Sequence, residues 1–270
     1  MNDIAAQYQK FILRRPLMAL IHTPAVVIHV TDYGESDKIV TFYTQKYGKT
    51  AAIAKGAKRS KKRFLNKLEY FSLLDIIADT ARHSSLLRLD QAELIAPYPF
   101  LRKSIQYYNG AMLICELMRL GTRENDCDDK LYNLLVWSLS ELNKGQSMSD
   151  IIIFFQLRML KLMGYQLSLS CCTNCGIKIS NVNTFSFSAV HNGLVCTRCI
   201  PVRGGQFSSL SMNTIKTLEM GQSLSLEKLS RLKFSQQSTR EALTLLRNYI
   251  PYLLQRDVHS WKQLEQNFVD

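Results

Sequence analysis

The chain has 270 residues, enough for two structural units, and its hydrophobic content of 46% and charged content of 21% are ordinary for a globular protein. No apolar run approaches the roughly 20 residues that a membrane-spanning helix needs. Arg14, Arg15 and Pro16 interrupt the N-terminus, which argues against a signal peptide. The net charge of +12 indicates a polyanionic partner. We therefore expect a cytoplasmic protein with no membrane partner.

The first part of the chain has the pattern of a small β-protein. Residues 1–22 are weakly patterned and are expected to form a lead-in, followed by a β-domain over 23–96. Short apolar or β-branched runs separated by turn residues predict five strands, at 25–31, 38–44, 49–55, 69–78 and 85–94. The OB-fold is the commonest five-stranded barrel, although a small sandwich would give a similar pattern. The sequence therefore favours an N-terminal OB-fold β-barrel.

From residue 97 to residue 270 the pattern is helical. Apolar residues at helical spacing predict helices at 100–121, 129–143, 150–163, 210–220 and 235–256, the last interrupted at Pro251. The segment 150–163 is apolar nearly all round and should lie at the centre of the domain, ending before Gly164. The predicted fold class is α+β multidomain: a barrel followed by an all-α domain.

The positive charge is concentrated in residues 38–68, which contain ten lysines and arginines and no acidic residue. Lys55–Arg63 is dense enough to follow a phosphate backbone, and arginine can bind two phosphate oxygens at once. Neighbouring aromatic residues that face outward could stack on bases; these are Phe42, Tyr43, Tyr47 and Phe64. The alternatives are a solvated loop or a segment that attracts acidic proteins.

Four cysteines predict a metal site inserted in the helical domain, over 168–203. Cys172, Cys175, Cys196 and Cys199 form two C-x2-C pairs, a spacing typical of zinc ribbons. Residues 185–187 and 193–195 between the pairs alternate like a small hairpin. Four thiolates leave no open coordination position, so the expected role is one structural Zn2+ per chain. Cys171 could replace Cys172 as a ligand.

The sequence offers no credible active site. Gly-rich phosphate-binding loops, nucleophile elbows and metalloprotease motifs are absent. Asp126, Asp128 and Asp129 precede a predicted helix, where N-capping explains them better than metal-dependent hydrolysis. We therefore expect a protein that is not an enzyme.

Several motifs resemble the bacterial RecO family of DNA repair proteins. Tyr33–Val40, Tyr47–Lys49 and Ala54–Arg59 read YGESDKIV, YGK and AKGAKR, in the order of the family's N-terminal signature. Leu162–Tyr165 reads LMGY and precedes the cysteine pairs, as in zinc-bearing members of the family. The resemblance covers roughly 25–265. One departure is that Met1–Leu17 precede the usual start, so Met18 is an alternative first residue.

The resemblance implies a mediator of homologous recombination, in the RecF pathway, located in the cytoplasm with the nucleoid. Such a protein binds single- and double-stranded DNA, anneals complementary strands and, with RecR, helps to load RecA onto DNA coated with single-stranded-DNA-binding protein (SSB). Residues expected to contact DNA are Lys38, Lys55, Lys58, Arg59, Lys61, Lys62 and Arg63. A groove near Phe155, Arg158 and Leu162 is expected to take the acidic C-terminal tail of SSB, the alternative being that these three are ordinary core and surface residues. The alternative is a basic adaptor of protein interactions that contacts nucleic acid only incidentally.

Overall fold

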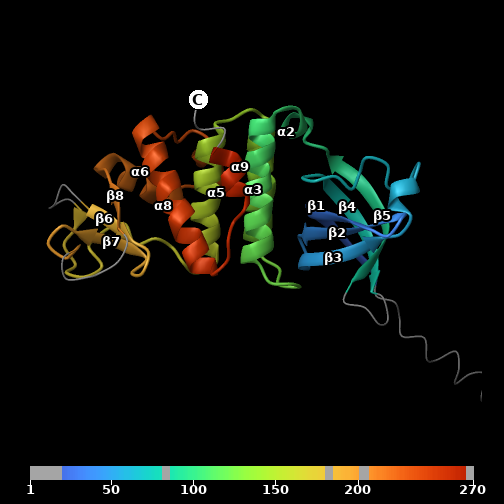
Figure 1. Ribbon diagram of the computed structural model, residues 1–270, viewed down its shortest axis with the longest axis horizontal. Helices are drawn as coiled ribbons and strands as arrows, with labels where there is room; N and C mark the ends of the chain where they lie inside the picture. Colours follow the sequence, from blue (N-terminus) through green and yellow to red (C-terminus); the bar gives the residue numbers. More distant parts are fainter. Residues whose placement is uncertain (1–19, 81–85, 180–184, 201–206, 266–270) are drawn as a thin grey trace, which may run out of the picture. The chain divides into compact units, whose positions relative to one another are not determined.

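The computed structural model describes residues 20–80, 86–179, 185–200 and 207–265. The chain divides into two compact units (Figure 1). The first, the barrel unit, comprises Met1–Pro97 together with Arg123–Cys127. The second, the helical unit, comprises Tyr98–Thr122 and Asp128–Asp270.

The barrel unit is a closed five-stranded barrel. Its strands are β1 (Leu20–Tyr33), β2 (Asp37–Thr44), β3 (Gly48–Ala54), β4 (Leu73–Thr80) and β5 (Leu87–Ala96). They follow the order β1-β2-β3-β5-β4 and pair antiparallel, except for the parallel pair β3–β5. The long strand β1 pairs with both β2 and β4, and a bulge between Val27 and His29 lets it bend around the barrel. The OB-like barrel predicted from the sequence is confirmed.

Alternation along the strands fills the inside of the barrel with apolar side chains. Val27, Phe42 and Ile76 are fully buried there. The segment between β3 and β4, which carries most of the positive charge, contributes Phe64 and Leu68 to the same core. This packing anchors the segment to the barrel, so its charged side chains project from a supported backbone.

Two strands, β1 and β4, begin four or more residues away from their predicted starts. β1 begins at Leu20, before the predicted start at 25, because its first residues pair with β4, in the register Leu20↔Asp79 to Pro24↔Asp75. β4 begins at Leu73 rather than at 69, because Phe71 has a positive φ of 71° and its N–H donates to the Val27 carbonyl at 3.0 Å. Pairings between such distant segments leave no local pattern in the sequence.

The helical unit is built around α5 (Met148–Leu162), which is apolar on almost every side and packs against α3, α4, α6 and α8 (Figure 1). The unit also contains a short sheet. The helices of the unit are α2 (Pro99–Lys103), α3 (Ile105–Gly121), α4 (Asp129–Asn143), α5, α6 (Met212–Ser223), α7 (Leu226–Leu229), α8 (Gln236–Leu254) and α9 (Ser260–Glu265). At the end of α5, Gly164 has a φ of 86° and Tyr165 N–H donates to Leu160 O at 2.8 Å, a Schellman ending. The central position and the end of this helix agree with the prediction.

Three features of the helical unit were not predicted correctly. The helix expected over 100–121 is divided at Ser104, which is extended. Pro251 lies inside α8 and does not interrupt it, because Leu246, Tyr249 and Ile250 hold that part of the helix on the core. The short helices α7 and α9 were not predicted, since fewer than two turns give too few residues to show a period.

A three-stranded sheet lies within the helical unit, formed by β6 (Phe185–Ser188), β7 (Gly193–Cys196) and β8 (Phe207–Leu210) in the order β7-β6-β8. The predicted hairpin corresponds to β6 and β7, whereas β8 was not predicted. The Phe187 ring contacts the Tyr249 ring of α8 edge-on at a centroid distance of 5.3 Å. The sheet therefore shares apolar packing with the helices.

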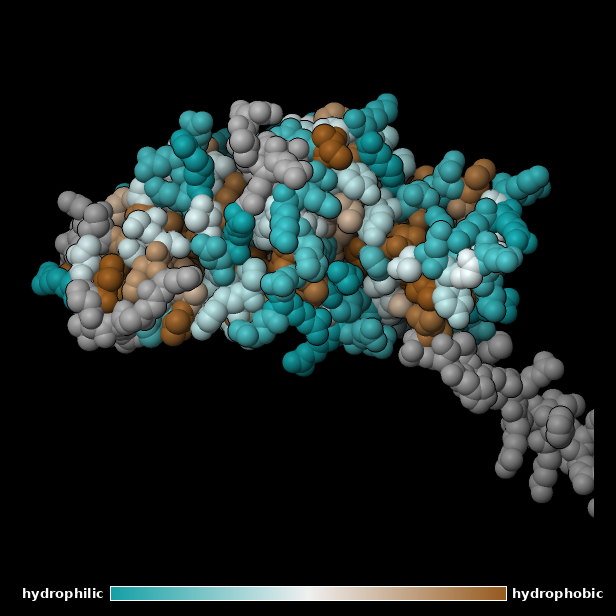
Figure 2. Space-filling model, viewed as in Figure 1, coloured by the Kyte–Doolittle hydropathy of each residue, from teal (hydrophilic) through white to brown (hydrophobic). Residues whose placement is uncertain are grey.

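The hydropathy of the surface is consistent with the burial of apolar side chains in the two cores. On the face that Figure 2 shows, hydrophilic side chains cover most of the described surface of each unit, and apolar side chains appear in small groups. None of the helices in the described ranges is both long enough and apolar enough to cross a membrane.

Gly48 shows how the barrel unit holds Arg123–Cys127, the connection from α3 to α4. Asn125 N–H donates to Lys49 O at 3.0 Å. Gly48 has a φ of 63°, and a Cβ atom there would lie 2.1 Å from the Asp126 carbonyl oxygen. Both the backbone conformation and the close approach therefore require glycine.

We expect Gly48→Ala to weaken the attachment of Arg123–Cys127 to the barrel by more than the roughly 1–2 kcal/mol cost of a left-handed alanine alone. Gly34→Ala is the matched control, because Gly34 has a similar φ of 57° but a Cβ atom there would meet no other atom within 4 Å. Amide hydrogen exchange at Asn125 measures the effect. Equal exchange in the two variants would contradict the steric account.

Candidate nucleic-acid interface and metal centre

The basic segment, defined here as Lys55–Arg63, leaves the end of β3 and is fastened to the β1–β2 turn. It includes the short 3-10 helix η1 (Ala57–Arg59). Gly56 N–H donates to Asp37 Oδ1 at 2.8 Å, and Lys58 N–H donates to Ser36 O at 2.9 Å. The Gly56 N–H, followed by the Ser36 hydroxyl, lowers the pKa of the Asp37 carboxyl, so this carboxylate stays ionised at neutral pH. The beginning of the basic segment is therefore held in one place.

Three of the predicted DNA-contacting residues make ion pairs with acidic residues that lie outside residues 38–68. Lys38 Nζ lies 3.5 Å from Glu69 Oε1, and Lys58 Nζ lies 3.0 Å from Asp32 Oδ2. Arg59 Nη2 lies 3.6 Å from Glu35 Oε2. Exposed pairs of this type contribute only about 0–1 kcal/mol, so a phosphate can compete for these cations.

The other four predicted contacts lie close to one another in sequence at the exposed part of the segment. Lys55, Lys61 and Lys62 are exposed and make no ion pair with any residue that the structure describes. Arg63 is held differently: its Nη2 donates to Lys55 O at 2.8 Å, and its guanidinium lies 4.3 Å from the centre of the Phe64 ring. Three lysines and one positioned guanidinium thus face solvent.

The neighbouring aromatic residues divide by burial. Phe42 and Tyr43 are fully buried and Phe64 is 3% exposed, so none of these three can stack on a base. Tyr47 is 37% exposed. Tyr33 was not predicted from the sequence; it is 55% exposed at the end of β1, next to the turn that receives the basic segment. Its place in a predicted turn rather than in the basic run explains the omission.

The four predicted cysteine ligands come together in the helical unit. The Sγ atoms of Cys172, Cys175, Cys196 and Cys199 all lie within 4.8 Å of one another. Cys175 Sγ and Cys196 Sγ are 3.7 Å apart, close to the separation of about 3.8 Å that follows from tetrahedral geometry with zinc–sulfur bonds of about 2.3 Å. The donor set and its spacing therefore fit a tetrahedral metal ion.

Backbone N–H groups around the cluster favour the thiolate form of Cys172. Burial raises the pKa of the Cys172 thiol, but N–H groups of Cys175, Cys196 and Asn174 donate to its sulfur and lower the pKa to about 6. The Ile177 N–H acts in the same direction on Cys175, whereas burial and the three neighbouring thiols raise its pKa to about 11. Four sulfurs so close together cannot all ionise without a cation among them.

Close backbone packing holds the two cysteine pairs together. Thr173 N–H donates to Leu194 O at 2.8 Å, and Leu194 N–H donates to Ser168 O at 3.0 Å. At Gly193, the first residue of β7, a Cβ atom would lie 2.5 Å from Thr173 Cγ2 and 2.9 Å from Ser168 O, so only glycine fits there. Cys171 is not part of the cluster: it forms an isolated bridge with Lys178.

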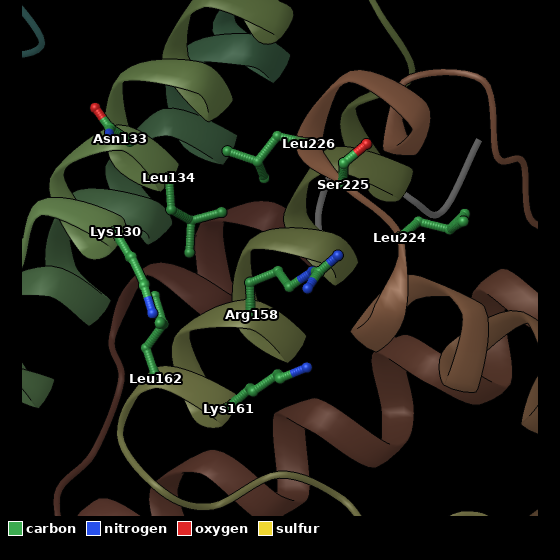
Figure 3. Close-up of a pocket in the computed structure, with 9 residues that line it drawn as sticks. All are labelled: Lys130, Asn133, Leu134, Arg158, Lys161, Leu162, Leu224, Ser225 and Leu226. Atoms are coloured by element: carbon green, nitrogen blue, oxygen red, sulfur yellow. The ribbon is translucent and has the colours of Figure 1, made fainter.

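A pocket of about 400 Å³ lies between α4, α5 and the residues that begin α7 (Figure 3). Arg158 and Leu162, predicted for a partner groove, both line it. Phe155, the third predicted residue, is fully buried and does not line it. Residues that the sequence analysis missed complete the lining: Lys130, Asn133, Leu134, Lys161, Leu224, Ser225 and Leu226. They come from distant segments, and no local pattern connects them.

Arg158 is the central polar group of this pocket. Its side chain extends from α5 toward Leu224 and Ser225 (Figure 3), and its Nη1 donates to Gln222 O at 2.7 Å. Its Nε and Nη2 are buried without a hydrogen-bond partner in the described part of the chain. Burial lowers the pKa of this guanidinium, although arginine stays charged at neutral pH. Arg158 thus offers two unused donors beside several leucines.

The structure also places the acidic residues that were considered for catalysis. Asp128 is the N-cap of α4, and its side chain accepts from Lys130 N–H and Leu131 N–H. The sequence had favoured this N-capping role over metal-dependent hydrolysis. Within the described ranges, the four cysteines form the one group of three or more potential metal ligands.

Comparison with known proteins identifies the family. The N-terminal model of recombination protein O matches residues 18–98, and its C-terminal model matches residues 102–262. The chain belongs to the RecO family. A DNA repair protein RecO from Syntrophus aciditrophicus is 33% identical over 245 residues, which cover 90% of this chain and 95% of the relative. Another, from Bacillus pumilus, is 30% identical over 230 residues, covering 85% and 88%. The resemblance found in the sequence is therefore confirmed for this RecO-family chain.

Proposed function

We propose that this RecO-family chain is a non-enzymatic recombination mediator of the RecF pathway that acts in the cytoplasm, at the nucleoid. It binds single- and double-stranded DNA and anneals complementary strands. With RecR, it helps to load RecA onto single strands coated with SSB. Family membership and the basic segment on the barrel support this proposal.

The observation that carries DNA binding is the exposed group of Lys55, Lys61, Lys62 and Arg63. Phosphate binding needs cations that can reach the backbone and release its counterions. Lys55, Lys61 and Lys62 need not first leave an ion pair with another described residue, unlike Lys58 and Arg59. We assign the larger part of the phosphate contact to the first group, and a smaller part to Lys38, Lys58 and Arg59.

Replacing Lys55, Lys61 and Lys62 with alanine should weaken binding to a single-stranded oligonucleotide and reduce its salt dependence. The slope of log K against log salt should become less negative by about 2, since each phosphate contact on a single strand contributes about 0.7. Fluorescence anisotropy over a series of salt concentrations measures both quantities.

The matched control removes the same charge from the helical unit, at the exposed lysines Lys103, Lys216 and Lys228. This variant should keep most of the slope. An unchanged slope in the Lys55, Lys61 and Lys62 variant would instead support the adaptor of protein interactions.

We infer that the cysteine cluster holds one structural zinc ion. The tetrahedral spacing and the all-sulfur donor set support zinc, and four protein ligands leave no position for a substrate. When bound, the ion would neutralise the ionised sulfurs of Cys172, Cys175, Cys196 and Cys199. In this proposal residues 168–203 are the zinc-holding module, and its strands β6 and β7 belong to the three-stranded sheet.

Elemental analysis should find one zinc ion per chain, and Cys175→Ser or Cys199→Ser should reduce it to a small fraction. Cys171→Ser should retain it, because Cys171 lies outside the cluster. Chelation should increase amide hydrogen exchange in β6 and β7 and leave the barrel strands unchanged, because the barrel has its own core. Unchanged exchange in β6 and β7 after the metal has been removed would refute a structural role.

We propose that the pocket around Arg158 takes the C-terminal tail of SSB. The lining supplies Lys130, Arg158 and Lys161 for carboxylates and Leu134, Leu162, Leu224 and Leu226 for an apolar end group. The two unused donors of Arg158 match a carboxylate, which can accept two parallel hydrogen bonds. An acidic peptide with an apolar C-terminal residue meets both requirements.

Arg158→Gln should weaken binding of such a peptide by roughly 10- to 100-fold, because a hydrogen bond to a charged group contributes about 1.5–3 kcal/mol. The fold should persist, since Lys161 Nζ also donates to Gln222 O at 3.1 Å. Isothermal titration with a free-acid and an amidated peptide measures the effect.

The charge-matched control is Arg231→Gln, at an exposed arginine that does not line the pocket. Equal loss of affinity in the two variants, or no preference for the free acid, would exclude this pocket as the tail site.

A further inference from the structure

A second groove in the helical unit has the chemistry of a phosphate site. It has a volume of about 570 Å³ and lies along one face of α8, with Ser149 of α5 and Trp261 of α9 also in its lining. Arg240 and Arg247 of α8 both line it, and no acidic residue does among those that the structure describes. Its charge therefore favours an anionic occupant.

The acidic residue of α8 lies outside the groove. Glu241 is the single carboxylate in Gln236–Leu254, and it does not line the groove. Its oxygens accept from Ser211 N–H at 2.8 Å and Gln237 Nε2 at 2.8 Å, and also from the Thr214 hydroxyl. The carboxylate is thus held at the α6 side of α8, outside the groove lining that contains Arg240 and Arg247.

Trp261 supplies a second and independent observation. It lines the groove and is only 5% exposed, yet its indole Nε1 has no hydrogen-bond partner within the described ranges. A buried N–H group without an acceptor is uncommon in folded proteins. An occupant of the groove that carries acceptor oxygens would supply one.

The remaining lining distinguishes a phosphate chain from an acidic peptide. Ser149, Thr239 and Thr244 offer hydroxyl groups, which together with arginine are the usual partners of DNA phosphates. One aliphatic side chain lines this groove, Leu243, whereas four leucines line the pocket around Arg158. A peptide needs apolar anchors of that kind, and a phosphate chain does not.

The spacing of the two arginines also suits a nucleic-acid backbone. Arg240 and Arg247 are seven positions apart in the sequence, which places them about 10 Å apart along the helix axis. The two guanidinium groups would therefore meet different phosphates of one strand.

We propose that this groove binds the sugar-phosphate backbone of a second single strand of DNA, in addition to the strand held by the barrel. The proposal rests on the DNA-binding function proposed above. Annealing requires that two strands be held by the protein at once, and the groove would give the helical unit a site for one of them.

The experiment uses the full chain and two oligo(dT) strands, which cannot pair with each other. One strand is immobilised and saturated with protein, and capture of a second, labelled strand is then measured. Arg240→Gln combined with Arg247→Gln should leave binding of the first strand nearly unchanged. It should reduce capture of the second strand by about tenfold or more, because each lost contact is a charged hydrogen bond. The salt slope of this capture should also become less negative by about 1.4.

Two further variants test the assignment. Arg231→Gln combined with Arg256→Gln removes the same charge from exposed positions of the helical unit outside the groove, and should capture the second strand normally. Trp261→Phe keeps an aromatic ring but removes the N–H group, so it should reduce capture even if the double arginine variant does not fold.

The outcomes separate this inference from the proposed function. If the wild-type protein does not bind the first strand, the proposed DNA-binding function itself fails. If it binds the first strand but the groove variant captures the second strand as the wild type does, the groove proposal alone is overturned. The same conclusion follows if the variant loses affinity for a polyglutamate peptide but not for DNA, which would identify an acidic protein as the occupant.

Discussion

The hydrogen bond from the Gly56 amide to Asp37 Oδ1, 2.8 Å long, is the constraint on which the candidate DNA surface depends. A run of lysines repels itself and would otherwise extend freely into solvent. Asp37 fixes the first residues of the run against the β1–β2 turn, and Phe64 fixes its end in the barrel core. The charges between these two points are therefore held close together on a rigid support. Because the carboxylate is ionised at neutral pH, it also offsets part of the positive charge at the place where the backbone must turn.

The surroundings of this contact show which features of the basic surface could be predicted from the sequence and which could not. Residues 38–68 contain no acidic residue, and this absence correctly identified a basic surface on a barrel. The pairing of Lys58 with Asp32 and of Arg59 with Glu35 could not be predicted, because it depends on how the turn before β2 meets the segment after β3. Alternation along β2 likewise did not determine the roles of Phe42 and Tyr43. Both are buried, one of them facing the barrel core, so that exposed aromatic surface is left to Tyr47 and Tyr33.

In the helical unit, the cysteine spacing predicted the metal cluster, whereas contacts between distant segments could not be predicted. The spacing of the cysteine pairs predicted the cluster correctly, because each C-x2-C turn brings its own two sulfurs together. The supporting strand β8 and the contact of Phe187 with Tyr249 come from segments far apart in sequence. The pocket around Arg158 shows the same division. Arg158 and Leu162 are four residues apart on one helix and share a face, whereas Phe155 points into the core and Leu224–Leu226 arrive from another element.

The basic segment and the pocket around Arg158 present positive charge in physically different settings, which suit different anionic partners. The lysines of the basic segment are exposed, so their attraction for an anion is screened by salt within about 8–10 Å and depends strongly on ionic strength. Arg158 lies in a partly buried pocket among leucines, where screening is weaker and apolar contact adds a contribution that salt does not remove. A surface of the first kind suits a long polyanion that must be released and rebound along its length. A pocket of the second kind suits a short chain end recognised by one carboxylate and one apolar group. An occupant that satisfied the first surface would lack the apolar end group needed by the second, so the two proposed sites would discriminate between DNA and an acidic tail although both attract negative charge.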